Sequence, residues 1–337
     1  MTPEIFQQHY DLAKRAVEDA LTGTLAARHW PGPLREAVEY SLLAGGKRLR
    51  PILVLKATEV CGESHADAMA AACAIEMVHT YSLIHDDLPS MDDDDLRRGR
   101  PTSHRVFGEA LAILAGDALL TLAFEMLSEI PSSAQITADC LTILARAAGG
   151  SGMVGGQILD LEAERGSFPT LQGANPRTAD SNSRAEFSDS AVLDEESAVE
   201  DSIPTSNNQT LHVEQLVRIH RMKTGALMTA ALELGAACAN ASAEQRRRLR
   251  IYGECTGLAF QIADDLLDVT GAEEKLGKET GRDFELGKLT YPSLIGIEAS
   301  QQKAVSLVER ACEALDIFDD RADFLRQLAR FIVERDH

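Results

Sequence analysis

Residues 67–98 read DAMAAACAIEMVHTYSLIHDDLPSMDDDDLRR, an apolar stretch that turns acidic and then basic. The apolar part lacks the alternation of a half-buried strand, so it predicts a helix from Asp67 to about Asp87. Pro89 ends this helix, because proline has no backbone N–H to donate and its ring clashes with the preceding turn. The aspartates therefore gather at the end of an apolar helix and in the loop that follows it.

This acidic run admits two interpretations. A run of like charges is usually a solvated surface. Two features favour a binding site: the run follows an apolar helix directly, and Arg97 and Arg98 follow the run directly. His79 lies two helical turns before Asp86 on the same face. For Asp93–Asp95 the solvated interpretation stays open.

The rest of the chain also has the pattern of helices. Aromatic residues make up 5% of the 337 residues, and alanine and leucine are abundant, which favours helices over strands. We therefore expect an all-α, single-domain helical bundle with no strand of useful length. A loop is expected at 92–105, and further helices are expected at 4–28, 34–44, from near Pro51, and at 109–129, 134–148, 152–165, 212–239, 243–270, 290–316 and 319–335.

One segment, residues 167–210, departs from the helical pattern. It contains eight acidic residues, two basic residues and eight serines, with only scattered apolar positions. Such a stretch cannot bury enough surface to offset its ordering entropy. We predict a disordered acidic insertion within one domain that spans residues 1–337, because motif residues occur on both sides of it.

Charge and composition narrow the class of protein. The formal net charge of −20 disfavours nucleic acid and anionic lipid as partners. The N-terminus has no apolar signal core, and no run approaches the ~20 apolar residues of a spanning helix. The six cysteines form no CxxC pair, which is typical of a reducing compartment. These observations predict a soluble cytoplasmic protein.

A second acidic cluster occurs in residues 261–271, QIADDLLDVTG. Asp264 and Asp268 are four residues apart, so both carboxylates leave one face of a helix. A solvated acidic face is the alternative, but the neighbouring residues are mostly apolar, where unpaired carboxylates are costly. Mg²⁺ would relieve the repulsion, because it takes carboxylate oxygens and leaves positions for phosphate.

Basic residues come in short groups that suit a diphosphate. Residues 45–51 read GGKRLRP, a glycine-rich turn in which arginine and lysine can approach phosphate oxygens closely. Arg97 and Arg98 form a second group, and Lys223 with Thr224 lies in an apolar helix. Lys278 and Lys288 flank Asp283 after the second acidic cluster. For any single lysine an ordinary surface position is the simpler explanation; the whole set favours a diphosphate site.

These motifs together resemble the trans-prenyl diphosphate synthases, most of all the bacterial farnesyl/geranylgeranyl diphosphate synthases. The resemblance rests on GGKRLRP, HTYSLIHDDLPSMDDDDLRRGRPTSH, GGQILD, KTGAL, FQIADDLLDV and GKETGRDFELGKLTYP, and it covers about residues 4–337 apart from 167–210. It implies a homodimer of all-α subunits, each with a central cavity. It also implies condensation of an allylic diphosphate with isopentenyl diphosphate, assisted by three Mg²⁺ ions, with the departing diphosphate accepting the released proton.

The resemblance also implies roles for individual residues. The expected catalytic residues are Asp86, Asp87, Arg97, Lys223 and Asp264. The expected metal ligands are Asp86, Asp87, Asp92, Asp160, Asp264 and Asp268. The isopentenyl diphosphate pocket would hold Lys47, Arg50, His79 and Arg98, and the allylic diphosphate would be held by Arg97, Lys223, Thr224, Gln261, Lys278 and Lys288.

Product length is expected to depend on Tyr81 and Ser82, which lie about one turn before Asp86. The bulky Tyr81 with DDxxxxD spacing resembles the bacterial farnesyl pattern and favours farnesyl diphosphate over geranylgeranyl diphosphate. A class I terpene cyclase or a head-to-head synthase is disfavoured, because the second motif is aspartate-rich and GGKRLRP is intact. A non-catalytic regulatory subunit is disfavoured because no site residue is lost.

Overall fold

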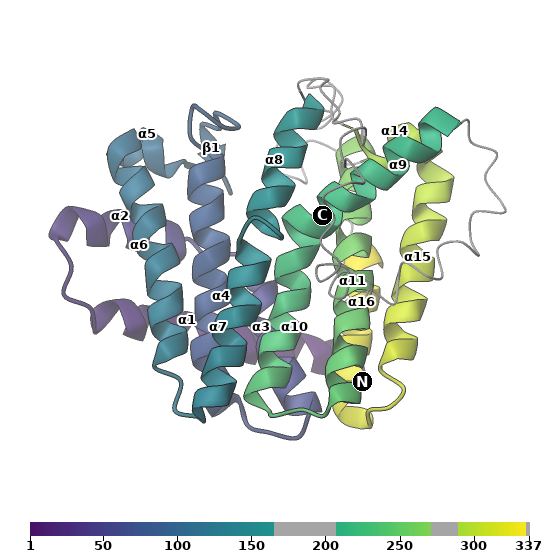
Figure 1. Cartoon of the computed structure of the whole chain (residues 1–337), viewed down its shortest axis with the longest axis horizontal. Coiled ribbons are helices and arrows are strands. Elements are labelled where there is room, and N and C mark those ends of the chain that lie inside the picture. Colours follow the sequence, from purple (N-terminus) through teal and green to yellow (C-terminus); the bar gives the residue numbers. More distant parts are fainter. Residues whose placement is uncertain (165–206, 271–288, 335–337) are drawn as a thin grey trace, which may run out of the picture.

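The computed structural model of the chain describes residues 1–164, 207–270 and 289–334 (Figure 1). The first of these ranges is helical apart from one two-stranded hairpin. Its elements are α1 (Pro3–Ala26), α2 (Gly32–Leu42), α3 (Leu49–Val60), α4 (His65–Asp86), β1 (Leu96–Arg97), β2 (Arg100–Pro101), α5 (Ser103–Phe107), α6 (Glu109–Ser128), α7 (Ala134–Ala148) and α8 (Met153–Glu164).

The remaining described residues are helical as well. They form α9 (Asn207–His220), the π-helical turn η3 (Arg221–Gly225), α10 (Ala226–Cys238), α11 (Ala243–Thr270), α14 (Tyr291–Ile295), α15 (Ile297–Ala314), the short η4 (Asp320–Ala322) and α16 (Asp323–Glu334). The expected all-α bundle is confirmed.

The centre of the bundle is the pair α3 and α10, which Figure 1 shows among the other long helices. Residues 51–58 of α3 are all buried, and Lys56 and Thr58 are the polar members of this otherwise apolar run, so the helix is covered on every side. Gly235 lets α10 approach α3 closely: a Cβ at Gly235 would come within 2.2 Å of the Val54 carbonyl oxygen. Around this pair, α4 packs on α3 and α6, and α11 packs on α10 and α15.

Several helix boundaries follow local capping chemistry. The side chain of Thr2 accepts a hydrogen bond from the Ile5 N–H at the start of α1, and Ser133 caps α7 in the same way. Thr290 and Ser293 exchange side-chain and backbone hydrogen bonds at the start of α14. This capping box fixes the start of α14 at Tyr291, two residues after the described chain resumes at residue 289.

Four sequence expectations need correction. The helix expected at 212–239 begins at Asn207, so residues 207–210 are the first turn of α9 and not part of the insertion. The same helix contains η3 in its middle. The helix expected at 290–316 is interrupted at Gly296, whose φ of +85° does not belong to a right-handed helix. The loop expected at 92–105 contains the β1–β2 hairpin and the start of α5. Residues 165–206 lie outside the described residues.

The expectation that no segment could span a membrane was also too strong. Helix α6 has 20 residues and contains an 18-residue window with a mean hydropathy of 1.8, so it is long and apolar enough to cross a membrane. A buried helix of a soluble protein meets the same criterion. One face of α6 packs on α4, and Ile113 and Leu114 on the remaining surface are exposed. The apolar residues of α6 therefore lie partly in the core and partly on one exposed face.

Candidate active site

The first acidic cluster sits where α4 ends. Asp86 is the last residue of the helix, and the chain then folds back, because the Asp92 N–H donates to the Asp86 carbonyl oxygen at 2.9 Å. Asp93 takes a φ of +50°, and its N–H donates to the Leu88 carbonyl oxygen at 3.2 Å. This tight turn brings Asp92 back to Asp86, although five residues separate them in the sequence.

The electrostatic surroundings of Asp86 suit a cation. Burial raises the pKa of the Asp86 carboxyl to about 6; the Lys223 ammonium opposes this rise, and the Asp92 carboxylate adds to it. The mutual repulsion of two neighbouring carboxylates would be relieved by a divalent ion between them. The shared influence of Lys223 and Asp92 also shows that η3 and the end of α4 face the same region.

Asp87 and Arg97 have a different arrangement. Asp87 is buried, and its Oδ1 accepts a hydrogen bond from Arg97 Nε at 2.6 Å. Arg97 also reaches Asp94 Oδ2 at 3.4 Å, and Asp94 is buried. Two expected roles, metal ligation by Asp87 and diphosphate binding by Arg97, thus fall on residues that pair with each other. The solvated interpretation of Asp94 was wrong.

The glycine-rich turn is shaped around Arg98. Gly46 has a φ of +128°, which residues with a side chain rarely adopt, and a Cβ there would lie 2.5 Å from Arg98 Nη1, so a substitution would strain the backbone and displace the guanidinium. Arg98 donates to the Gly45 carbonyl oxygen. The Lys47 carbonyl oxygen accepts a hydrogen bond of 2.5 Å from the Tyr10 hydroxyl, which ties α1 to the turn. Lys47 itself is exposed.

Beside this turn lies a buried charge centre that the sequence interpretation missed. Glu76 of α4 is 2% exposed, and its Oε1 accepts a hydrogen bond from Arg48 Nη1 at 2.7 Å. Arg48 also donates to the Leu42 carbonyl oxygen at 2.7 Å. Glu76 attracts Arg50 and Arg98 as well, so one carboxylate faces three guanidinium groups. An acid alone in the apolar run AIEMV was the signal that could have revealed it.

His79 lies one turn after Glu76, next to the same arginines. Burial lowers the pKa of His79 well below its ordinary value, and the charges of Arg50 and Arg98 lower it further. The imidazole is therefore neutral at physiological pH, able to donate from one nitrogen and accept at the other. Three of the four residues expected in the isopentenyl diphosphate pocket thus lie together.

Lys223 is held by α8 and by an unusual helical turn. Its Nζ forms a 2.5 Å ion pair with Asp160 Oδ2. Gly156, one turn before Asp160 on the same face of α8, makes this possible: a Cβ at Gly156 would lie 2.3 Å from the Lys223 backbone nitrogen. Lys223 and Thr224 both belong to η3, and π-helical turns of this kind are frequent at functional sites.

The second acidic cluster divides its aspartates between two environments. Asp264 and Asp268 are partly exposed, whereas Asp265 is buried at 4% exposure. Gln261, one turn earlier on α11, accepts a hydrogen bond of 3.0 Å from the Thr224 hydroxyl. Asp264 attracts Arg50, so the second cluster and the buried charge centre around Glu76 act on the same region. Lys278 and Lys288 lie outside the described residues.

The donor set fits a divalent metal that is completed by substrate. Among residues 1–164, 207–270 and 289–334 no three histidine, cysteine or acidic side chains form a ready metal site. Mg²⁺ is usually bound through one or two carboxylates together with substrate phosphates and water. Paired carboxylates such as Asp86 and Asp92 match that requirement, and Asp264 with Asp268 provides a second carboxylate pair.

The two residues expected to govern product length lie below the aspartates. Tyr81 is buried, and its ring meets the His85 ring edge-on at 5.7 Å. The Ser82 hydroxyl donates to the His79 carbonyl oxygen at 2.8 Å. His85 is itself pressed against Gly116 of α6, where a Cβ would lie 2.1 Å from His85 Nε2. Tyr81 therefore lies against His85, and His85 in turn packs closely against α6.

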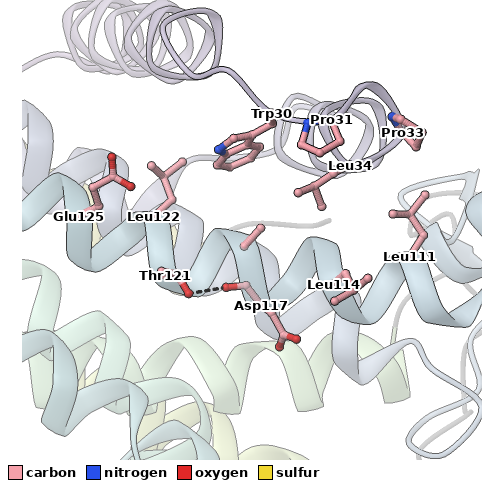
Figure 2. Close-up of a pocket in the computed structure, with 11 residues that line it drawn as sticks. Trp30, Pro31, Pro33, Leu34, Leu111, Leu114, Asp117, Thr121, Leu122 and Glu125 are labelled. Atoms are coloured by element: carbon pink, nitrogen blue, oxygen red, sulfur yellow. Dashed lines mark hydrogen bonds between the residues drawn. The ribbon is translucent and has the colours of Figure 1, made fainter.

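A separate groove lies between α6 and the segment that carries Trp30 and Leu34 (Figure 2). It has a volume of about 590 Å³ and none of the expected site residues lines it. Figure 2 shows Trp30, Pro31 and Leu34 on one wall, with Leu114 and Leu122 of α6 opposite. The groove is thus distinct from the aspartate clusters.

Two acidic clusters that face basic groups across a helical bundle define a diphosphate-utilising enzyme. Residues 31–316 match the family model described as polyprenyl synthetase, so the chain belongs to the polyprenyl synthetase family and is a prenyltransferase.

Relatives that match most of the chain refine this class. The chain is 40% identical to a farnesyl diphosphate synthase of Geobacillus stearothermophilus, over 98% of each protein. It is 45% identical to geranylgeranyl pyrophosphate synthase 12, chloroplastic, of Arabidopsis thaliana, over 86% of this chain and 70% of that protein. The crystal structure of an FPP/GFPP synthase from Zymomonas mobilis matches with a TM-score of 0.75 at 34% identity, covering 98% of this chain and all of the other. The chain is a short-chain trans-prenyltransferase.

Proposed function

We propose that the enzyme condenses isopentenyl diphosphate with dimethylallyl and geranyl diphosphates to give farnesyl diphosphate. The observation that carries this proposal is the position of Asp86, whose carboxyl is influenced by Asp92 and by Lys223 at once. A pair of carboxylates for metal and a cation for phosphate thus meet at one place. The nearby Arg50, Arg98 and His79 supply a second anion site, as a two-substrate condensation requires.

The residues divide the chemistry between them. Bound Mg²⁺ would neutralise the leaving diphosphate of the allylic substrate. We assign Asp86, Asp92, Asp264 and Asp268 to hold the metal. Lys223, Thr224 and Gln261 would position the allylic diphosphate so that its C–O bond breaks and leaves an allylic cation. Preorganised charges of this kind stabilise the separating diphosphate more than they stabilise the intact substrate.

The second substrate would be placed by Lys47, Arg50, His79 and Arg98. Its C3–C4 alkene attacks the cation, a carbon–carbon bond forms, and the departing diphosphate accepts the proton that is lost. A neutral His79 suits this pocket, because an uncharged imidazole can donate a hydrogen bond to phosphate and does not have to carry a positive charge beside the arginines. We assign Asp87 and Arg97 to shaping the loop as a pair, with metal and diphosphate contacts formed when substrate arrives.

The basic test is turnover with sized products. The enzyme is incubated with isopentenyl diphosphate and dimethylallyl, geranyl or farnesyl diphosphate, with and without Mg²⁺. We expect Mg²⁺-dependent condensation with the first two primers and a C15 product. Absence of condensation with every primer in the presence of Mg²⁺ would contradict the proposal.

Geranylgeranyl diphosphate is the second candidate product, favoured by the identity to the Arabidopsis thaliana enzyme. The buried ring of Tyr81 favours C15, because it would block a growing chain below Asp86. We expect Tyr81→Ala to lengthen the product and Tyr81→Phe to keep it unchanged. An unchanged product length in Tyr81→Ala would mean that another residue limits the growing chain. A dominant C20 product of the wild type would favour the second candidate.

We also propose that two copies associate as a homodimer through the outer face of α6. Apolar Ile113 and Leu114 are 43% and 56% exposed there, and Leu114 also lines the groove of Figure 2. Such a surface suits a second copy and gives no reason to insert α6 into a membrane, so we propose a soluble cytoplasmic enzyme. Sedimentation should report a dimer, and Leu114→Glu should shift it toward monomer, whereas Val305→Glu on exposed α15 should not.

We further propose that residues 1–337 function as one domain. Helices α8 and α9, on either side of residues 165–206, both pack against η3, which carries Lys223. The two halves of the chain therefore complete one site. Replacing residues 167–206 with a short flexible linker should leave the Mg²⁺-dependent condensation intact, and loss of folding or activity would contradict this organisation.

A further inference from the structure

The middle aspartate of the second cluster has a different set of contacts from its neighbours. Asp265 is 4% exposed, and its Oδ1 accepts a hydrogen bond of 3.3 Å from Gln261 Nε2. Its Oδ2 accepts a hydrogen bond of 3.0 Å from the Tyr291 N–H. Tyr291 is the first residue of α14, 26 positions further along the chain. Asp265 therefore joins α11 to the helix that resumes after residues 271–288.

The contacts of Asp265 continue into the turn that carries Lys223. Gln261 accepts a hydrogen bond from the Thr224 hydroxyl at 3.0 Å while it donates to Asp265. On the other side, the Tyr291 ring lies 5.7 Å from the ring of His220, tilted by 32°. His220 directly precedes η3, the turn that contains Thr224. The contacts thus form a ring that runs from η3 to α11, on to α14, and back to the end of α9 directly before η3.

Helical geometry explains why Asp265 and Asp264 play different parts. Consecutive residues on a helix are about 100° apart, whereas residues four apart share a face. Asp264 and Asp268 therefore point together, and Asp265 points away from them toward α14. A carboxylate that accepts two hydrogen bonds inside the protein is stabilised in its place and poorly disposed to leave it for a metal.

We propose that Asp265 is a positioning residue and not a metal ligand: its carboxylate fixes Gln261 and the start of α14, and through Gln261 it sets the position of Thr224 and Lys223. This inference rests on the proposed function for its kinetic part only. It predicts that the two adjacent aspartates, Asp264 and Asp265, differ in the kind of damage that their replacement causes.

The amide of asparagine separates the two roles. In Asp265→Asn, the side-chain oxygen can still accept from the Tyr291 N–H, while its NH₂ faces Gln261. Gln261 can rotate its amide by half a turn and accept from that NH₂, and the Thr224 hydroxyl can then accept from Gln261, because a hydroxyl serves in either role. The hydrogen bonds that link Thr224, Gln261, residue 265 and Tyr291 therefore survive without the negative charge. Asp265→Ala removes both acceptors.

The experiment compares Asp265→Asn, Asp265→Ala and Asp264→Asn in full-length enzyme. Steady-state assays give the Mg²⁺ concentration for half-maximal rate, kcat, and KM for the allylic diphosphate. We expect Asp264→Asn to raise the Mg²⁺ requirement by about tenfold or more, as loss of a ligand should. Asp265→Asn should stay within about threefold of wild type in every parameter, whereas Asp265→Ala should lose about 10–100-fold in kcat/KM at an unchanged Mg²⁺ requirement.

A second measurement tests the hydrogen bond between residue 265 and the Tyr291 amide without any turnover. Hydrogen exchange at the start of α14 should accelerate in Asp265→Ala and remain slow in Asp265→Asn and Asp264→Asn, because only the alanine variant lacks an acceptor for the Tyr291 amide. A wild type that fails to condense diphosphates would refute the proposed function and leave this exchange comparison to decide the inference.

Three results would overturn the inference. An Mg²⁺ requirement raised in Asp265→Asn as far as in Asp264→Asn would make Asp265 a ligand. Wild-type kinetics in Asp265→Ala would deny it a positioning role. Unchanged exchange in Asp265→Ala would deny the anchor itself. If the alanine variant does not fold, the comparison of the two asparagine variants still decides between ligand and anchor.

Discussion

Replacing Gly156 by alanine should separate α8 from the turn that carries Lys223. A Cβ at this position would lie 2.3 Å from the Lys223 nitrogen and 2.7 Å from its Cα, both of them backbone atoms. Ordinary van der Waals contact begins at 3.4 Å. Because backbone cannot rotate away as a side chain can, α8 must move by about 1 Å to make room.

The expected damage is larger for activity than for stability. Overpacking of this kind costs about 1–3 kcal/mol, while alanine in place of glycine in a helix returns about 1 kcal/mol, so the net loss of stability is about 0–2 kcal/mol. The displacement also pulls Asp160 away from Lys223, now 2.5 Å apart. A shift of about 1 Å in a positioning group can cost about 100-fold in rate. We therefore expect kcat/KM for the allylic diphosphate to fall by about 10–100-fold.

The assay measures kcat/KM for the allylic diphosphate together with the midpoint of urea unfolding. Gly150→Ala is the matched control, because it lies just before α8 and a Cβ there meets nothing within 4 Å. The control should keep wild-type activity. If Gly156→Ala retains wild-type kcat/KM and stability, α8 does not press on the Lys223 backbone and the reasoning fails.

Three other perturbations test separate parts of the site. Glu76→Gln removes the buried countercharge of Arg48 and should lower the free energy of unfolding by about 3 kcal/mol in urea titrations. Burial holds the pKa of His220 at about 3, below its ordinary 6.5, so the stability that accompanies the neutral ring is present above pH 6.5 and is lost as pH falls toward 3. His220→Phe should therefore make the melting temperature fall less steeply between pH 6.5 and 4. Because the pKa of Asp86 is raised to about 6, protons should compete with Mg²⁺ below that pH, and calorimetric Mg²⁺ affinity in the presence of a diphosphate should weaken from pH 7 to pH 5.

Each of these has a clear contrary result. Wild-type stability of Glu76→Gln would mean that Arg48 needs no countercharge. An unchanged pH slope in His220→Phe would show that this ring takes up its proton as it does in the unfolded chain. Mg²⁺ affinity independent of pH between 5 and 7 would remove Asp86 from the metal site.

The helical period was enough to predict which residues share a face. It grouped Asp264 with Asp268, and His79 with Asp86, because these relations depend only on 3.6 residues per turn. It also located α7 and α11 at their observed bounds. Positions of this kind are local, and the sequence carries local geometry well.

Relations between distant segments were beyond the same reasoning. The Tyr291 amide that Asp265 accepts from lies 26 residues away, and the Arg97 that binds Asp87 comes from a hairpin. Such partners depend on how α11 approaches α14 and how the loop after α4 folds, which no periodicity encodes. The η3 turn was missed because the helical pattern of apolar residues in α9 continues into α10 without a visible break.

The η3 turn also has a consequence for the geometry of the whole helix from Asn207 to Cys238. A π-helical turn closes hydrogen bonds over five residues instead of four, so it holds one residue more than regular helix would. The side chains beyond it are therefore rotated by about one residue's worth of angle relative to those before it. Helix α9 can keep the phase that suits α8 and α14, while α10 keeps the phase that suits α3 and α7. The helix from Asn207 to Cys238 thereby packs against two sets of neighbours with two different phases. Lys223 and Thr224 lie at the point where the phase changes.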